Sequence, residues 1–259
     1  MSSQAAVRIA GVRKSFPGRS RRAAPRRALE GFDLQVQEGE FLCLLGPSGC
    51  GKSTLLNLLA GFSRPDSGDV FLDGDRIIGP GPERGVLFQT PMLFPWLSTL
   101  DNVLYGPRAR HDVTPEIRER ALDLLETVGL SDAKDAYPHE LSGGMRHRAA
   151  FARVLVNRPR LLLMDEPFGA LDAITRVAMQ RFLLHLWERD RITIVFVTHD
   201  VEEAVLLGDR NCVMSGTPGR TRATLDVDLP RPRDLDVTET LEFVALKRQV
   251  REALEGSAA

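Results

Sequence analysis

The sequence has no long apolar stretch. Its longest apolar runs, at residues 41–45, 161–164 and 192–197, are far shorter than the roughly 18–20 residues of a membrane-spanning helix. The N-terminus also lacks the apolar block of a signal peptide. We therefore expect a chain that neither crosses a membrane nor is exported by the usual route, and the short runs are typical of buried strands.

Cysteine is scarce. The three cysteines, Cys43, Cys50 and Cys212, are odd in number and show no C-x-x-C spacing. This pattern argues against a disulfide framework and against a structural zinc site, and it favours a reducing compartment. We expect small thiols that lie buried or in loops.

Neither sign of charge is in excess. The chain of 259 residues has 34 Lys and Arg against 35 Asp and Glu, a formal net charge of −1. This balance argues against a protein that coats nucleic acid through bulk electrostatics. Hydrophobic residues at 43% and charged residues at 27% are typical of a globular protein. The length suits one large domain or two small ones.

Lysine is also rare, because arginine supplies most of the positive charge; the four lysines are Lys14, Lys52, Lys134 and Lys247. Residues 7–29 hold eight basic residues and no acidic one, and they include a loop-like insert at 18–27. We interpret this insert as a solvated surface loop, with a patch for anions or lipid headgroups as the alternative.

Strand-like and helix-like segments alternate along the chain. The expected strands are short and mostly apolar, at residues 32–36, 41–45, 70–72, 86–88, 161–164 and 192–197. The expected helices lie at 55–62, 115–128, 173–189 and 239–255, within a chain that is mainly helical from about 100 to 156. This order predicts an α/β fold with a mainly parallel sheet and an inserted helical subdomain.

The strongest motif is GPSGCGKST, which follows the apolar strand at 41–45 and opens a helix. It matches G-x-x-x-x-G-K-[ST] in the strand-to-helix context that this motif requires. Glycines let successive N–H groups face one anion, and the helix N-terminus adds positive charge. Lys52 would neutralise the β- and γ-phosphates, and the Ser53 hydroxyl would ligate Mg²⁺. The predicted nucleotide-binding residues are Gly46, Pro47, Ser48, Gly49, Cys50, Gly51, Lys52, Ser53 and Thr54.

An acidic pair follows the next apolar strand, in LLLMDEP at 161–167. Asp165 stands at the carboxyl end of this strand, where open α/β sheets bind ligands. We predict that Asp165 holds Mg²⁺ through water and that Glu166 orients or deprotonates the attacking water. Acidic residues commonly end strands, so the pair alone is a weak signal. Together with the phosphate loop it indicates a nucleotide-hydrolysing site.

The segment LSGGMRHR, at 141–148, offers a second anion site. Ser142, Gly143 and Gly144 precede a helix, so backbone amides are available at its start. A single chain seldom needs two phosphate cradles for one ATP. We therefore predict that this one serves the nucleotide of another molecule, through head-to-tail pairing of two nucleotide-binding faces.

With these motifs in this order, the chain resembles the ATP-binding subunit of an ABC transporter over residues 7–233. The resemblance implies a P-loop NTPase core, an N-terminal antiparallel β region and an inserted helical subdomain, with ATP and Mg²⁺ as cofactors. We expect an ATPase domain at 1–233, its helical subdomain at about 95–157, and a C-terminal helical tail at 234–259.

The resemblance assigns roles to further positions. Phe16 resembles the aromatic residue that stacks on adenine, although the basic insert lengthens its spacing from the phosphate loop; a core-facing Phe is the alternative. Gln89 resembles the glutamine that contacts Mg²⁺ and the attacking water, and residues 169–172 resemble the D-loop at the dimer interface. His199 resembles the switch histidine that hydrogen-bonds the γ-phosphate. The expected catalytic residues are thus Lys52, Gln89, Glu166 and His199, and the expected metal ligands are Ser53, Gln89 and Asp165.

Two positions depart from the family pattern. Met145 stands where Gln is commoner, which weakens any side-chain role there and leaves the Ser-Gly-Gly cradle intact. His147 stands where Gln is frequent, and the pattern indicates no function for it. The histidines interpreted as structural are His111, His139, His147 and His185.

Segments 79–89, 94–103, 165–176 and 214–220 resemble importers of the nitrate, sulfonate and taurine group, and GPGPERG is most similar to the taurine and alkanesulfonate branch. The resemblance implies two ATPase copies, two membrane permease subunits and a periplasmic or lipid-anchored solute-binding protein. It places the chain at the cytoplasmic face of the inner membrane, without a nucleic-acid partner. The expected cargo is taurine or an alkanesulfonate, with nitrate or another small molecule as the alternative.

The segment PMLFPWL, at 91–97, is unusually apolar for a loop beside a nucleotide site. We predict that permease coupling helices dock near residues 89–96, with local packing as the alternative. A DNA-repair ATPase of this class would carry long coiled-coil arms, a translation-associated one would carry two cassettes, and a P-loop kinase would lack LSGG. A soluble, non-transport ABC ATPase remains the alternative class.

Overall fold

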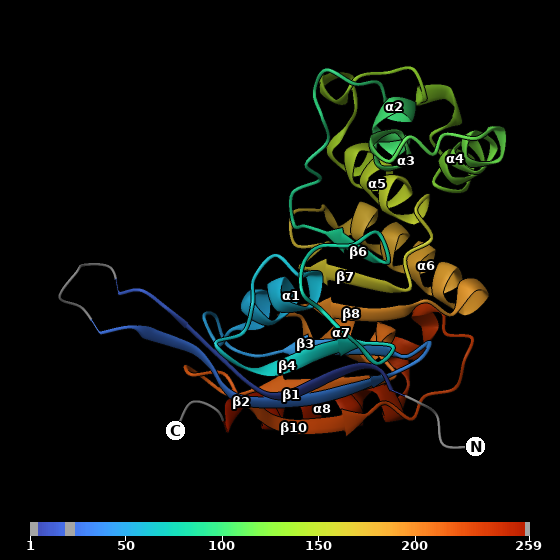
Figure 1. Cartoon of the computed structure of the whole chain (residues 1–259). Helices are drawn as coiled ribbons and strands as arrows, with labels where there is room; N and C mark the ends of the chain where they lie inside the picture. Colours follow the sequence, from blue (N-terminus) through green and yellow to red (C-terminus); the bar gives the residue numbers. More distant parts are fainter. Residues whose placement is uncertain (1–4, 19–23, 257–259) are drawn as a thin grey trace. The chain divides into compact units, whose positions relative to one another are not determined.

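The computed structural model describes residues 5–18 and 24–256, and the chain divides into two compact units (Figure 1). The first unit comprises Met1–Gly81 and Leu184–Ala259, and the second comprises Pro82–Leu183. The helical subdomain expected at about 95–157 lies inside the second unit. Within the described ranges, none of the helices is long and apolar enough to span a bilayer.

An antiparallel sheet of order β2-β1-β4-β5 belongs to the first unit. Its strands are β1 (Ala5–Phe16), β2 (Arg26–Gln37), β4 (Ser67–Leu72) and β5 (Asp75–Arg76). Phe32, Leu34 and Val36 of β2 are buried and the residues between them are exposed, the alternation that predicted a strand at 32–36. The confirmed antiparallel β region is longer than expected, because β2 pairs with β1 over almost its whole length.

The basic insert is shorter than predicted. Residues 19–23 of the predicted loop lie outside the described residues. Arg26 and Arg27 were assigned to the loop, but they begin β2, where they pair with Phe16 and Ser15 of β1. This end of the loop prediction is therefore wrong, because pairing with β1 extends the strand to Arg26.

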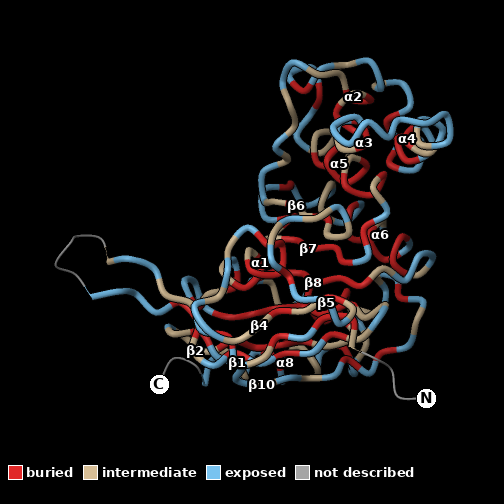
Figure 2. The backbone as a smooth tube through the Cα atoms, in the orientation of Figure 1, coloured by how far each residue is buried: buried red, intermediate tan, exposed pale blue. Residues whose placement is uncertain are grey.

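The first unit also holds four strands of a mainly parallel sheet, β3 (Phe41–Leu45), β8 (Thr193–Val197), β9 (Arg210–Met214) and β10 (Thr221–Asp226). β3 pairs in parallel with β8 and β9, and β10 is antiparallel to β9. All residues of β3 and β8 are buried, and β8 is red along its length in Figure 2. The predicted mainly parallel sheet is confirmed, because continuous apolar strands are covered on both faces.

The helices of the first unit are α1 (Lys52–Ala60), α7 (Val201–Leu207) and α8 (Leu241–Glu255), with a 3-10 turn η3 (Leu235–Glu239) before α8. α7 packs on β3, and α8 packs on α7, β9 and β10. α8 starts after Thr240, whose hydroxyl accepts a hydrogen bond from the Phe243 amide at 3.3 Å. The predicted start at Glu239 is therefore wrong, because this cap fixes the first turn.

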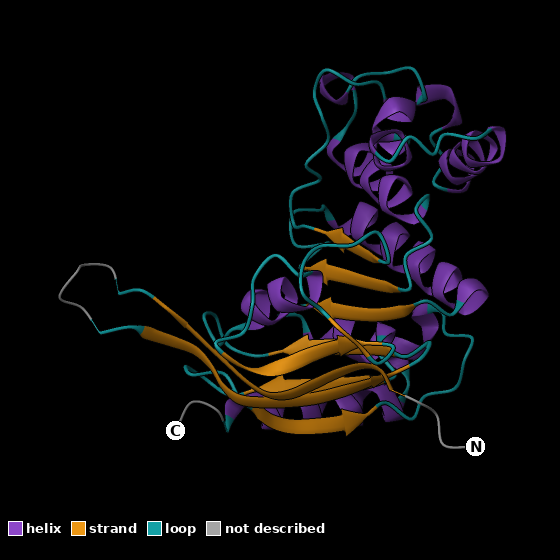
Figure 3. Ribbon diagram, in the orientation of Figure 1, coloured by secondary structure: helices purple, strands orange, loops and turns teal. Residues whose placement is uncertain are grey.

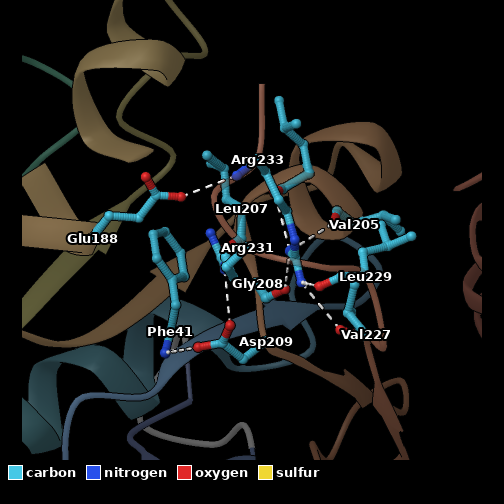
Figure 4. A network of polar contacts seen from close by, with 11 residues as sticks. Phe41, Glu188, Val205, Leu207, Gly208, Asp209, Val227, Leu229, Arg231 and Arg233 are labelled. Atoms are coloured by element: carbon cyan, nitrogen blue, oxygen red, sulfur yellow. Dashed lines mark hydrogen bonds and ion pairs between the residues drawn. The ribbon is translucent and has the colours of Figure 1, made fainter. Parts of the chain in front are cut away.

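A buried arginine fastens the segment between β10 and α8 (Figure 4). The guanidinium of Arg233 donates hydrogen bonds to carbonyl oxygens of Val205, Leu206, Gly208, Val227 and Leu229 at 2.7–3.3 Å. Burial lowers the pKa of Arg233 to about 10, so it remains charged at neutral pH. Its neighbour Arg231 donates to Asp209 at 2.8 Å and lies 4.3 Å from the Trp187 ring centroid.

The second unit combines two parallel strands with short helices (Figure 3). The strands are β6 (Arg84–Leu87) and β7 (Leu161–Asp165). The helices are α2 (Thr99–Val103), α3 (Tyr105–Ala109), α4 (Pro115–Thr127) and α5 (Gly143–Leu155), with 3-10 turns η1 (Ser131–Ala133) and η2 (Pro138–Glu140). α6 (Ala173–Asp190) begins in this unit and ends in the first. As predicted, Thr114 caps α4 and Pro115 lies in its first turn.

Candidate active site

The phosphate loop joins the end of β3 to α1, and its glycines are required by its shape. Gly49 and Gly51 have positive φ angles of 79° and 105°. A Cβ atom on Gly51 would lie 2.8 Å from the Ala28 carbonyl oxygen and 2.9 Å from Leu29 Cδ2. Gly51 also precedes α1, so α1 begins at Lys52 and not at the predicted residue 55. The loop thus presents a tight backbone cradle at a helix start.

Lys52 is only 8% exposed, and it lies within this cradle. Its Nζ donates to the carbonyl oxygen of Gly46 at 2.7 Å and to that of Pro47 at 3.2 Å. The ammonium is therefore held by the loop's own backbone. A fixed cation among backbone amides is the chemistry that binds the phosphates of a nucleotide.

Two side chains outside the motif support the phosphate loop. Arg26 of β2 donates to the Gly49 carbonyl oxygen at 3.2 Å, and Thr217 Oγ1 donates to the same oxygen at 3.0 Å. A Cβ atom on Gly219 would collide with the Cys50 carbonyl oxygen. Sequence reasoning missed these contacts because no local motif marks them; the segment 214–220 stood out only through its family resemblance.

Phe16 ends β1 beside the phosphate loop. It is 42% exposed and pairs with Arg26, the residue that contacts Gly49. Lys14 Nζ lies 5.6 Å from the centroid of its ring. The core-facing alternative is therefore wrong, because the ring is at the surface. An exposed ring at this place is available for stacking on a base.

His199 follows β8 at the same sheet edge, since β8 is parallel to β3 and Leu44 pairs with Val197. It is exposed between two anchored neighbours. Thr198 Oγ1 donates to Glu203 at 2.7 Å, and Asp200 caps α7 by accepting from the Glu202 amide at 2.8 Å. These contacts fix the backbone on both sides of the imidazole.

In the second unit, Gln89 follows β6 and Asp165 is the last residue of β7, and these parallel strands end at one edge, where Leu87 pairs with Met164. Glu166, next to Asp165, has a left-handed φ of 46°, a strained conformation that recurs at functional sites. The Gly169 amide donates to the Glu166 carbonyl oxygen at 3.1 Å, and a Cβ on Gly169 would lie 3.3 Å from Gln89 Nε2. The structure thus brings Gln89 to the turn that follows the acidic pair.

The segment 169–172 leads directly into α6. Asp172 accepts from the Thr175 amide at 3.0 Å and from its hydroxyl at 2.7 Å. The bond from the Thr175 amide is the main cause of a lowered pKa of Asp172. This cap fixes the start of α6.

The signature segment forms an exposed helix start. Ser142 caps α5 by accepting a hydrogen bond from the Met145 amide at 3.2 Å, and Ser142 and Gly143 are exposed. A Cβ on Gly144 would lie 2.7 Å from Thr175 Cγ2, so the glycine lets α6 approach. A cavity of about 410 Å³ adjoins Ser142, Gly144 and Thr175. The predicted second anion cradle is an accessible surface, and whether it binds an anion remains a prediction.

The predicted Mg²⁺ ligands lie in both units, and each of them carries a donor that suits Mg²⁺. In residues 5–18 and 24–256, no group of three or more His, Cys, Asp and Glu side chains could hold a metal ion. Ser53, Gln89 and Asp165 offer a hydroxyl, an amide and a carboxylate oxygen. Such hard oxygen donors suit Mg²⁺, which usually keeps waters and binds substrate phosphates.

Comparison with known proteins points to one family. The family model described as ABC transporter matches residues 29–169. The chain is 45% identical to the nitrate import ATP-binding protein NrtD of Synechococcus elongatus over 247 residues, 94% of this chain and 89% of that protein. It is 51% identical to the taurine import ATP-binding protein TauB of Roseobacter denitrificans over 196 residues, 75% of this chain and 72% of that protein.

A solved structure agrees with these relatives. The fold is similar to a dimeric ATP-binding cassette in a post-hydrolysis state, bound to ADP and Pi, with a TM-score of 0.74. That chain is 31% identical, and the match covers 86% of this chain and 100% of that one.

Proposed function

Because the chain belongs to the ABC transporter family and is an ATP-binding subunit that hydrolyses ATP, we propose that it drives uptake of a small anion. One observation carries the proposal: the exposed start of α5 at Ser142, in a chain that already has a phosphate cradle before α1. Two cradles for one nucleotide imply two copies that share each ATP. We place the chain at the cytoplasmic face of the inner membrane, attached through permease subunits.

The residues of the first unit would hold the nucleotide. Lys52 and the backbone amides of residues 46–54 would bind the phosphates, and Phe16 would stack on the adenine. His199 would donate a hydrogen bond to the γ-phosphate. Together these interactions hold the nucleotide so that its γ-phosphorus is positioned for attack by water, which lowers the entropic cost of the reaction.

The residues of the second unit would act on the attacking water. Glu166 would accept a proton from it, and Gln89 would orient it, as water replaces ADP on the γ-phosphorus to give ADP and phosphate. Ser53, Gln89 and Asp165 would hold Mg²⁺, which neutralises charge on the β- and γ-phosphates when bound. Ser142, Gly143 and Gly144 would hold the γ-phosphate bound to the other copy.

A surface of the second unit suits a permease contact. In the segment 91–97, Met92 is 62% exposed and Trp96 is 69% exposed, whereas Phe94 packs on Tyr105 with ring centroids 4.2 Å apart. Local packing therefore accounts for Phe94, whose ring also lies 5.5 Å from that of Trp96, and the permease contact remains a proposal. Asn102 fixes this loop by accepting from the Phe94 amide and donating to three loop carbonyl oxygens at 2.8–3.1 Å. A neighbouring groove of about 470 Å³ would receive a coupling helix of the permease.

The favoured cargo is a sulfonate such as taurine or an alkanesulfonate. GPGPERG before Gln89 is similar to that branch, and the taurine relative has the higher identity, 51%. Nitrate is the alternative, since the nitrate relative aligns over 94% of the chain. Cargo selection would belong to the solute-binding protein and the permease.

The test is co-purification of the tagged chain from detergent-solubilised membranes of the cells that produce it. We expect the tagged chain to retain both permease subunits and the Trp96→Ser variant to lose them. Trp187 is buried in the core and is not substituted. Recovery of ribosomes or DNA instead would contradict the transport function. ATPase stimulation in proteoliposomes by the solute-binding protein loaded with taurine, or with nitrate, separates the two cargoes.

A further inference from the structure

Helix α5 holds the segment that carries Gln89 by side-chain hydrogen bonds. We name residues 89–94 the Gln89 loop. Arg153 of α5 donates to the carbonyl oxygens of Pro91 at 3.0 Å and Met92 at 2.6 Å. His147 Nε2 lies 3.2 Å from the carbonyl oxygen of Gln89 itself. Arg153 therefore binds two backbone carbonyls of an irregular loop, and the Nε2–H tautomer of His147 binds the carbonyl of Gln89.

The backbone of this loop is strained at Met92, whose carbonyl oxygen accepts a hydrogen bond from Arg153 of α5. Met92 has a left-handed φ of 48°, although it is not a glycine. Such a conformation is strained in a residue other than glycine and persists only when the surroundings determine it. The bond from Arg153 to the Met92 carbonyl oxygen is one such determinant. The loop conformation thus depends on α5 and not on local sequence preference.

His147 also contacts the start of its own helix. The side chain is 7% exposed, and its Nδ1 lies 3.0 Å from the carbonyl oxygen of Gly143. Gly143 belongs to the Ser142–Gly144 cradle. One imidazole therefore spans the distance between the signature backbone and the Gln89 backbone, a role that no spacing in the sequence indicated.

We infer that His147 and Arg153 are positioning residues, which set the Gln89 side chain from the helix whose N-terminus forms the Ser142 cradle. The inference rests on the proposed function, in which Gln89 orients the attacking water and the cradle binds the nucleotide of another copy. A displacement at the start of α5 then reaches Gln89 through the imidazole. Neither residue touches the reacting atoms.

Substitutions that keep one imidazole contact at a time test this directly. A Gln side chain places its amide nitrogen near the position of Nε2, whereas Asn reaches only the position of Nδ1. His147→Gln therefore keeps a donor for the Gln89 carbonyl, and His147→Asn keeps one for Gly143 alone. For the purified full-length chain we expect kcat of MgATP hydrolysis to fall about tenfold in His147→Asn, the worth of one hydrogen bond. KM for ATP should stay within about twofold, because the phosphate loop is untouched.

His147→Gln is the matched control and should retain wild-type kcat. Arg153→Lys, which keeps the charge and loses the forked pair of donors, should lower kcat with unchanged KM. Equal kcat in the Gln and Asn variants would overturn the inference. A decrease of kcat in both variants that parallels their loss of thermal stability would also overturn it, because His147 would then have a structural role only.

Hydrogen exchange of the amides in the Gln89 loop gives a readout that needs no ATPase activity. Exchange should accelerate in His147→Asn and Arg153→Lys and remain unchanged in His147→Gln. Unchanged exchange in all three would overturn the inference even if the chain is an active ATPase. A wild-type chain without ATPase activity would instead contradict the proposed function, and the exchange data would still decide the positioning contact.

Discussion

The side-chain nitrogen of Lys52 lies 2.7 Å from the carbonyl oxygen of Gly46, the first residue of the loop that ends at the lysine's helix. A chain with a net charge of −1 therefore carries a fixed, buried cation in its phosphate loop. Binding of a polyanion depends on this local arrangement and not on overall charge.

Replacing Lys52 with Ala should abolish most ATP hydrolysis. The variant loses the cation that stabilises charge on the phosphates, and we expect kcat/KM to fall by about 10²–10³-fold. Phosphate release under MgATP measures this. Lys247→Ala is the control, because Lys247 lies on α8, where it pairs with Glu202 at 2.6 Å and lies 5.7 Å from the Phe243 ring centroid. Equal losses in the two variants would refute a specific role for Lys52.

Gly51→Ala should disrupt the phosphate cradle. At a φ of 105°, with the Ala28 carbonyl oxygen 2.8 Å from a new Cβ, the loop must shift. The strain should cost about 1–3 kcal/mol in free energy of unfolding and weaken nucleotide binding. Gly216→Ala, where a Cβ meets nothing within 4 Å, is the control. Fluorescent nucleotide titration compares the two, and wild-type affinity in Gly51→Ala would contradict the geometry.

Arg233→Met should destabilise the first unit strongly. The substitution leaves buried carbonyl oxygens, among them those of Val205, Gly208 and Val227, without their donor. We expect the free energy of unfolding to fall by about 3–5 kcal/mol. Arg248→Met removes an exposed ion pair with Glu252 and should cost at most about 0.5 kcal/mol. Urea denaturation of both variants checks the difference.

The thiols of the native chain should resist alkylation at pH 8. Burial raises the pKa of Cys50 and Cys43, and it raises that of Cys212 to about 12. A raised pKa lowers the fraction of reactive thiolate at a given pH, and burial also excludes the reagent. Mass spectrometry should find no iodoacetamide adduct on the native chain and three after unfolding. Rapid native labelling of Cys50 would show that the phosphate loop opens.

The features that depend on neighbouring residues in the sequence could be predicted from the sequence alone. The runs at 41–45 and 192–197 are buried strands because apolar residues there are covered on both faces. The expectation of buried, unpaired cysteines is confirmed, since Cys43, Cys50 and Cys212 are buried and free. The phosphate loop was recognised because its glycines and Lys52 fall within nine consecutive residues.

Contacts between distant segments could not be predicted. β1 went unrecognised because bulges, such as those between Ile9 and Val12, interrupt its alternation. Arg26 and Thr217 meet at the Gly49 carbonyl oxygen from opposite ends of the chain. His147 lies 58 residues from Gln89, and only the folded second unit shows that they touch.

The cargo is the least determined feature for a different physical reason. In the proposed function the solute-binding protein and the permease select the anion, so the motifs of this chain report on ATP and not on the cargo. The relatives are named for nitrate import and for taurine import, at 45% and 51% identity.

If two copies share each ATP, the Glu166→Gln variant should trap them as a pair. This variant keeps the shape of the side chain and removes the proton acceptor, so bound ATP should persist and hold the two copies together. Light scattering of Glu166→Gln in MgATP should give twice the mass of the chain, and the variant should release little phosphate. The double variant that also carries Ser142→Arg should be a monomer. A Glu166→Gln chain that binds MgATP and stays monomeric would contradict the account.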